Sequence, residues 1–155
     1  MSTVDAAGVV LLVAIVTNGL LAGLFFFCAC AVVPGFRRVD ARTAVAAFRA
    51  INRAIVGGWF LLVFFLAPVS TVTAAVLVPS PVSAAGAVCA VLTFLVTVVG
   101  NVPLNTALER ADVGAEADLR RAWAAFARPW ASLNLTRTLT ALAALALCAA
   151  SAVVH

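Results

Sequence analysis

The feature that most limits how this chain folds is a series of four long apolar runs. They cover residues 6–33, 55–78, 82–107 and 130–154. Each is at least as long as the roughly 20 residues that a helix needs to cross the hydrocarbon core of a bilayer. Hydrophobic residues make up 65% of the chain and charged residues only 10%, which excludes an ordinary soluble domain. The sequence predicts a single all-α domain over residues 1–155, an integral membrane four-helix bundle.

The basic residues are concentrated in two of the segments that connect these runs. All ten are arginines, of which five lie in residues 34–54 and four in residues 108–129, whereas the LVPSPVSAAG connection at 77–86 is uncharged. The positive-inside rule therefore predicts that both arginine-bearing loops are cytoplasmic and both termini lie outside, in a bacterial plasma membrane. Because the arginines flank the spans instead of forming an aromatic-rich patch, the expected partner is the lipid bilayer and not nucleic acid.

The two arginine-bearing loops also carry amphipathic patterns. In DARTAVAAFRAINR, residues 40–53, apolar side chains recur at helical spacing with arginines between them. LRRAWAAFARPW, residues 119–130, has a similar pattern. Each predicts a short helix at the membrane interface. The first apolar run is expected to end at Pro34 and Gly35, because proline cannot continue the helical hydrogen-bond ladder.

Small and polar residues within the first run indicate contacts with other helices. Gly19 and Gly23 form a G-x-x-x-G pair, which lets a second helix approach closely and predicts a surface for homo-oligomers. Asn18 is expected to donate an interhelical hydrogen bond. The four cysteines lie inside the apolar runs without a C-x-x-C pair, which favours small buried side chains over a thiol oxidoreductase site. They are Cys28, Cys30, Cys89 and Cys148.

A stripe of polar residues follows the third run at intervals of four. Steps of four drift only slightly around a helix of 3.6 residues per turn, so these side chains share one face. The stripe consists of Thr93, Thr97, Asn101, Asn105 and Glu109.

The fourth run carries a second polar face, formed by Trp130, Asn134 and Arg137 at positions i, i+4 and i+7. An arginine at the centre of a span costs about 2.5–3.5 kcal/mol on insertion scales, which favours an internal partner. Antiparallel spans bring this face, the stripe and the start of the second run to the same depth. The sequence therefore predicts a polar cluster that faces the bundle interior near the cytoplasmic surface. Its members are Asn52, Asn101, Asn105, Asn134 and Arg137.

Pro103 predicts a pocket beside this cluster. It has no N–H, and its ring displaces the carbonyl of Val99, so the helix is expected to bend there. Carbonyl groups without partners are tolerated at membrane depth only against protein or a wet cavity. Together with Gly100, this places the expected pocket beside Asn101 and Asn105.

Two motifs together resemble the signature of the anthrone oxygenase-like family of small membrane proteins, long catalogued as a domain of unknown function. They are GNVPLNTALER, residues 100–110, and RPWASLNLTRT, residues 128–138. In that family an N-x-P-x-N element closes the third span and a W-x-x-x-N-x-x-R element opens the fourth. The AVVPGF exit from the first run is similar as well. The chain departs from the family at Leu135, where relatives often carry histidine, so a mechanism based on that histidine does not transfer.

The resemblance implies a cofactor-independent oxygenase that converts the central methylene of an anthrone-type aromatic polyketide to a quinone carbonyl, with O2 as co-substrate. Four side chains would stabilise an oxyanion: Asn101, Asn105, Asn134 and Arg137. The carboxylate of Glu109 is the best candidate for the base. Four others would contact the hydrophobic aromatic substrate: Asn52, Trp59, Thr97 and Trp130. No metal site is predicted, because haem and copper sites need histidine, methionine or clustered cysteine.

Two other classes of function remain open from the sequence. A non-catalytic module that binds or transports a quinone or lipid would use the same pocket without turnover. A structural subunit of a membrane complex would use the Gly19 and Gly23 face, and would tolerate replacement of Asn101, Asn105 and Arg137.

Overall fold

The computed structural model describes residues 3–112 and 114–154, nearly all of which are helical. The elements are α1 (Thr3–Phe27), the π-helix η1 (Cys28–Val32), α2 (Val33–Phe36), α3 (Ala41–Ile55), α4 (Gly58–Leu77), α5 (Pro81–Leu95), the π-helix η2 (Val96–Asn101), α6 (Val102–Arg110) and α7 (Glu116–Val154). Four helical stretches of the described chain are long and apolar enough to cross a membrane: Ala6–Phe36, Gly58–Leu77, Pro81–Arg110 and Glu116–Val153. The predicted all-α membrane bundle is therefore confirmed.

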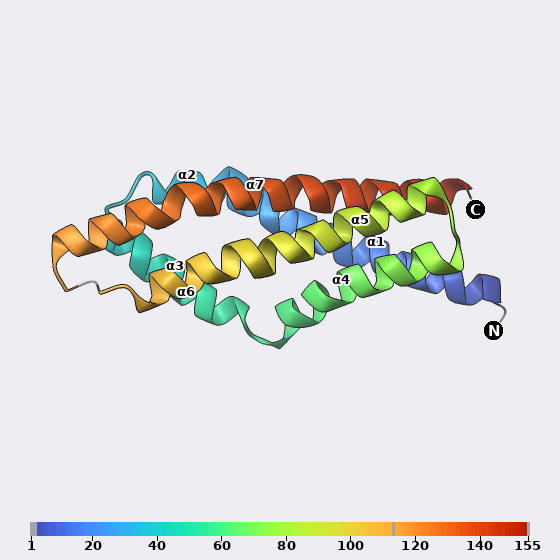
Figure 1. Cartoon of the computed structure of the whole chain (residues 1–155), viewed down its shortest axis with the longest axis horizontal. Helices are drawn as coiled ribbons and strands as arrows, with labels where there is room; N and C mark the ends of the chain where they lie inside the picture. Colours follow the sequence, from blue (N-terminus) through green and yellow to red (C-terminus); the bar gives the residue numbers. More distant parts are fainter. Residues whose placement is uncertain (1–2, 113, 155) are drawn as a thin grey trace.

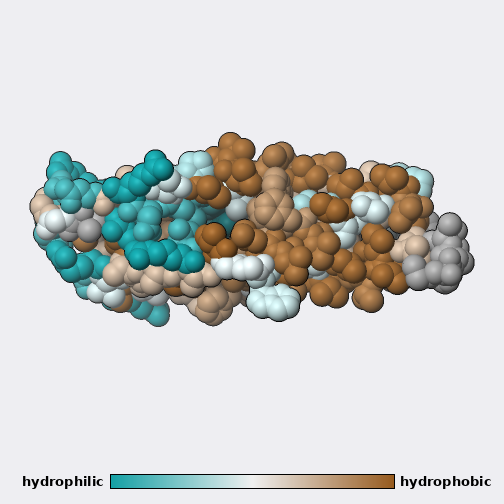
Figure 2. Space-filling model, turned by 90° about the horizontal axis from the view of Figure 1, so that it is seen from below, coloured by the Kyte–Doolittle hydropathy of each residue, from teal (hydrophilic) through white to brown (hydrophobic). Residues whose placement is uncertain are grey.

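The four long stretches form a closed bundle in which α7 and α4 each pack against both α1 and α5 (Figure 1). Both termini and the α4–α5 connection lie at one end, and the α2–α3 and α6–α7 connections lie at the other (Figure 1). Figure 2 shows hydrophilic residues gathered over the end that carries α3, whereas hydrophobic residues cover most of the remaining face. The two arginine-bearing segments thus share one end, while their orientation across a membrane stays a prediction.

The amphipathic helix predicted over residues 40–53 is present as α3. Asp40 caps it by accepting hydrogen bonds from the backbone N–H and the hydroxyl of Thr43, and these bonds hold the pKa of the Asp40 carboxyl below its ordinary value. Its apolar face is buried through Val45 and Phe48. The chain breaks before α4, so the second span begins at Gly58 and not at residue 55.

Two predicted helix boundaries are wrong. The first helical stretch continues through Pro34 to Phe36, because Pro34 lies in the first turn of α2, where the missing N–H is least disruptive. The segment 119–130 is not a separate interfacial helix, since α7 is continuous through Pro129. Phe126 and Trp130, on either side of that proline, are buried in one cluster with α3, which supports the helix across the lost hydrogen bond.

A π-helix comes directly before the helix that holds Pro103, where the sequence predicts a bend. Just before each of Pro34 and Pro103, the helix widens to i→i+5 hydrogen bonds in η1 and η2. In η2 the N–H of Val102 donates to the carbonyl of Thr97. Because such segments change the angular position of the side chains that follow, η2 sets the direction of the last turns of this stretch. Asn101, its last residue, is only 1% exposed.

The polar and small residues of α1 are used inside the bundle. Asn18 donates a hydrogen bond to Thr71 Oγ1 at 2.8 Å, which links α1 to α4 as expected. Gly19 packs close to α7, because a Cβ at this position would lie 3.7 Å from a methyl carbon of Leu145. Gly23 faces open space. Association of two copies through these glycines stays a prediction.

The close approach of η2 to α7 can be tested by substitution at Gly100. A Cβ there would lie 2.9 Å from Leu133 Cδ1, which is closer than packed side chains allow. We expect Gly100→Val to lower the free energy of unfolding by about 1–3 kcal/mol through overpacking, measured as a lower Tm in detergent. Gly23→Val is the matched control, since no atom lies within 4 Å of its added Cβ. Equal Tm values for the two variants would contradict this packing.

Candidate functional site

The register between the third and fourth helical stretches determines which polar groups meet. Thr93 Oγ1 donates to Thr140 Oγ1 at 2.7 Å, and Gly100 packs onto Leu133 further along the same antiparallel pair. Asn101 therefore lies level with the part of α7 just before Asn134. This is the depth at which the sequence predicts the polar cluster.

Asn134 is the most buried polar side chain of the site, with 0% of its surface exposed. Its Nδ2 donates to the carbonyl oxygen of Phe25 at 3.0 Å, near the end of α1. Its Oδ1 accepts a hydrogen bond from Arg137 Nη2, also at 3.0 Å. One amide thus links α7 to α1 and orients the guanidinium.

Arg137 is a buried cation that is surrounded mainly by aromatic rings. Its Cζ lies 4.4 Å from the centroid of the Phe25 ring and 5.6 Å from that of Trp130, while its Nε has no partner among the described residues. Desolvated cation–π contacts are worth about 2 kcal/mol or more, which is comparable to the cost of placing arginine within a span. None of the described carboxylates pairs with Arg137. These contacts therefore stabilise the cation without neutralising its charge.

The two amides of the N-x-P-x-N motif differ in their surroundings. Both Nδ2 and Oδ1 of Asn101 are buried without a hydrogen-bond partner among the described residues. Asn105 is half-buried, and its Nδ2 donates to Asn52 Oδ1 on α3 at 2.8 Å, while its Oδ1 is buried and unpartnered. The predicted contact between Asn105 and Asn52 is therefore present. The Asn101 amide and Asn105 Oδ1 keep the capacity to form further hydrogen bonds.

Glu109 ends the polar stripe near the surface of the molecule. Its Oε1 pairs with Arg53 Nε at 3.1 Å, with the two side chains 37% and 69% exposed, respectively. Its Oε2 is buried and has no partner among the described residues. Glu109 therefore contacts solvent on one side and the protein interior on the other.

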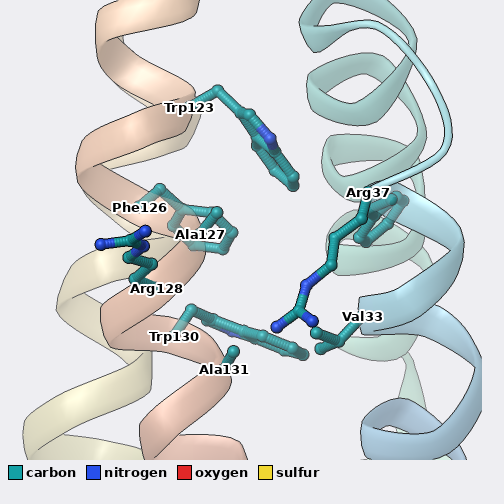
Figure 3. Close-up of a pocket in the computed structure, with 9 residues that line it drawn as sticks. Val33, Arg37, Trp123, Phe126, Ala127, Arg128, Trp130 and Ala131 are labelled. Carbon is teal, nitrogen blue, oxygen red and sulfur yellow. The ribbon is translucent and has the colours of Figure 1, made fainter.

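An aromatic pocket of about 100 Å³ lies between α7 and the end of the first helical stretch (Figure 3). Trp123 and Trp130 form two of its walls, and the guanidinium of Arg37 points into it toward Trp130 (Figure 3). Arg128 also borders the pocket, but its guanidinium points away from it in this view (Figure 3). Trp130 thus borders the pocket and also lies close to Arg137. Because complete small-molecule sites usually measure about 300–1,000 Å³, this pocket accommodates only part of a polycyclic molecule.

A second cavity, of about 160 Å³, lies between α6 and α7 and is lined by apolar residues such as Leu104 and Phe126. Neither cavity is lined by Asn101 or Asn105. Neither of these two cavities therefore lies beside the amides, where Pro103 led us to expect a pocket.

The structure brings most of the predicted residues to one region. Asn101, Asn134 and Arg137 are buried. Asn52 and Asn105 meet across the α3–α6 contact, as described above. Trp130 is buried as well, at 8% exposure. The catalytic and binding roles assigned to all of these residues stay predictions.

Two substrate-contact predictions have different outcomes. Thr97 is buried and lies on the stripe, where its hydroxyl donates to the carbonyl of Thr93 at 2.9 Å. Trp59 is 84% exposed and does not reach the site, so its predicted contact with a substrate there is corrected. Trp59 lies in the first turn of α4 on the exposed side, whereas its neighbour Phe60 packs against the core. An exposed tryptophan at the end of a span is typical of the aromatic belt at a membrane interface.

Sequence reasoning missed three contributors to the site. Phe25 supplies both a ring and a carbonyl, but nothing distinguishes it in the sequence from Phe26 and Phe27, which are more than half exposed. Arg37 and Trp123 complete the aromatic pocket. The signal available for Arg37 was its position directly after the first span.

The comparison with protein families agrees with the two sequence motifs. Residues 6–147 match the family described as anthrone oxygenase, a range that includes both motifs and all four spans in whole or in part. No curated protein and no solved structure matches the chain. Because the match covers far more than half of its length, this chain belongs to the anthrone oxygenase family.

Proposed function

We propose that this chain is a membrane-embedded oxygenase that oxidises a polycyclic phenolic, anthrone-type substrate with O2 and needs no cofactor. The observation that carries the proposal is Arg137, a buried cation for which the described residues supply no carboxylate. Membership of the anthrone oxygenase family supports an oxygenase-type activity. The proposal requires a substrate that is apolar enough to enter from the bilayer and that becomes an oxyanion during the reaction.

The aromatic pocket supports a flat substrate. One end of the ring system would lie between the indoles of Trp123 and Trp130, beside the Arg37 side chain (Figure 3). A shift of the Trp130 ring would bring the substrate oxygen toward Arg137, whose Cζ is 5.6 Å from that ring. With the arginine-bearing end in the cytoplasm of a bacterial cell, the pocket would open near the inner surface of the plasma membrane.

The proposed reaction balances without a metal or flavin. A base removes one proton from the methylene carbon, which produces an enolate. The enolate transfers one electron to O2, and the resulting radicals combine in a carbon–oxygen bond to form a peroxide. The peroxide takes up a proton, and loss of the remaining C–H proton together with hydroxide leaves a carbonyl group. One O2 is consumed and one water is released for each methylene that is oxidised.

The charge that develops in this sequence is negative and lies on oxygen. Arg137, oriented by Asn134, is proposed to stabilise the enolate oxygen, with Asn101 supplying a further amide donor. Preorganised donors of this kind usually contribute the largest part of catalysis by electrostatic stabilisation. Glu109 is the carboxylate proposed to receive the proton, although it lies at the solvent end of the stripe.

Removal of the guanidinium tests the proposal directly. We expect Arg137→Gln to lower the rate of anthrone oxidation by about 10²–10³-fold, the usual cost of losing an oxyanion donor. The rate is measured from the absorbance of the quinone product, together with O2 uptake by purified protein. Arg38→Gln, at an exposed arginine outside the pocket, is the control. If the wild type does not accelerate the reaction over buffer, anthrone oxidation is excluded. If the wild type is active and Arg137→Gln matches it, stabilisation of the oxyanion by Arg137 is excluded. Retention of a bound quinone without O2 uptake would identify a binding module instead.

A second prediction concerns Trp130 and Trp59, which the sequence analysis both assigned to substrate contact and which should differ in their effect on KM. Trp130→Leu removes a wall of the pocket and should raise KM by roughly 3–10-fold, since aromatic contacts are worth about 0.5–1.5 kcal/mol beyond their buried area. Trp59→Leu should leave KM unchanged, because Trp59 is 84% exposed and away from the pocket. Steady-state kinetics of the two variants in the same detergent decide the question. Equal effects on KM would place the substrate elsewhere.

A further inference from the structure

Three successive turns of the helix that ends the third span carry polar atoms that the described protein leaves unpaired. They are Glu109 Oε2, Asn105 Oδ1 and both amide atoms of Asn101, all buried. The three residues follow one another at intervals of four, so their side chains share a face. Leaving a buried donor or acceptor without a partner is costly, and native proteins normally satisfy such groups with protein or ordered water. An uninterrupted row of them indicates a common partner.

The two ends of this row lie in different surroundings. At the outer end, Glu109 is 37% exposed and pairs with Arg53, so it is in contact with the aqueous phase. At the inner end, Asn101 is 1% exposed. Its neighbour Gly100 packs onto Leu133, next to Asn134. The row therefore leads from solvent to the depth of the buried polar site.

The spacing of the row matches single water molecules. Four residues of helix rise about 6 Å along the axis, which is close to two O–H···O hydrogen bonds of about 2.8 Å each. A water placed between neighbouring side chains would find a polar atom on either side. Asn52 lies next to the row through its hydrogen bond to Asn105 and supplies a further amide. Buried waters typically make about three such bonds.

We propose that Glu109, Asn105 and Asn101 line a hydrated track that connects the arginine-bearing end of the molecule with the buried site. The track carries water and protons, and it takes no part in the transfer of electrons to O2. Its role in catalysis rests on the proposed function, since each turnover would release one water and move protons between carbon, oxygen and solvent. In that role Glu109 exchanges protons with the buried site through water, which reconciles its position at the surface with its part in the chemistry. The hydration itself does not depend on turnover.

Hydration of the track can be measured without any substrate. Cysteine is introduced at Asn105 or Asn101 in a variant whose four native cysteines are replaced, and the protein is exposed to Ag⁺ in chloride-free buffer. Ag⁺ is a small cation that reaches a thiolate through water and not through lipid. Thiols that remain free are then labelled with N-ethylmaleimide after denaturation and counted by mass spectrometry. Val99→Cys and Val102→Cys are the matched controls, because they lie on either side of Asn101 along the helix and are 72% and 47% exposed.

We expect Asn105→Cys and Asn101→Cys to react with Ag⁺ at least about tenfold faster than the two controls, given the cost of placing a charge in lipid. A second substitution, Asn105→Leu, should slow the reaction at Asn101→Cys by blocking the track. The proposal is overturned if positions 101 and 105 react no faster than 99 and 102, or if Asn105→Leu has no effect. If Asn101→Cys does not fold, as judged by its Tm, position 105 alone decides by the same comparison. A dry track with normal anthrone oxidation would reject this inference and leave the proposed function intact.

Discussion

The arrangement of this protein depends on how an apolar bundle holds a buried guanidinium for which the described residues supply no carboxylate. Arg137 is stabilised by one hydrogen bond to Asn134 and by the rings of Phe25 and Trp130. Asn134 is in turn anchored to the carbonyl of Phe25. The first and fourth spans are therefore joined around a positive charge that they solvate but do not neutralise. In a medium of low dielectric constant such a charge is a strong attractor for an oxyanion.

The two π-helices set the direction of the helical turns that follow them. Each precedes a proline, and each shifts the residues that follow it relative to a regular α-helix. After η2, the last turns of the third span present Asn101 to the interior and Asn105 to α3. The aromatic cluster between α3 and α7 then closes the arginine-bearing end, leaving a small pocket at Trp130. Polar interior, aromatic pocket and exposed end thus follow one another along a single axis, which suits a substrate taken from lipid and a reaction that exchanges protons with water.

Much of this fold could be predicted from the sequence, because membrane spans are set by length and hydrophobicity alone. The four spans and the amphipathic α3 were confirmed, as was an interhelical hydrogen bond from Asn18, whose partner on α4 only the structure gave. The two wrong helix boundaries lie at or near prolines, whose effect on a helix depends on their surroundings. Pro34 was expected to end a helical stretch that continues to Phe36. Residues 119–130 were expected to form a separate helix, but they are part of α7. Pro34 is accommodated by its position in the first turn of α2, directly after a π-helix. At Pro129 the helix is supported by packing of Phe126 and Trp130 against α3, which a single sequence does not reveal.

For the candidate site, the sequence by itself determined which residue types lie at which depth. The four-residue spacing of the stripe, and the positions of Asn134 and Arg137 in an otherwise apolar run, required polar groups to share faces within the membrane. Only the tertiary structure decided their partners: that Phe25 and not Phe26 meets the guanidinium, that Trp59 faces outward, and that Arg37 and Trp123 border a pocket. The physical reason is that helical periodicity orients a side chain about its own axis, whereas its neighbours depend on the rotation and offset of other helices, which are settled by packing of the whole bundle.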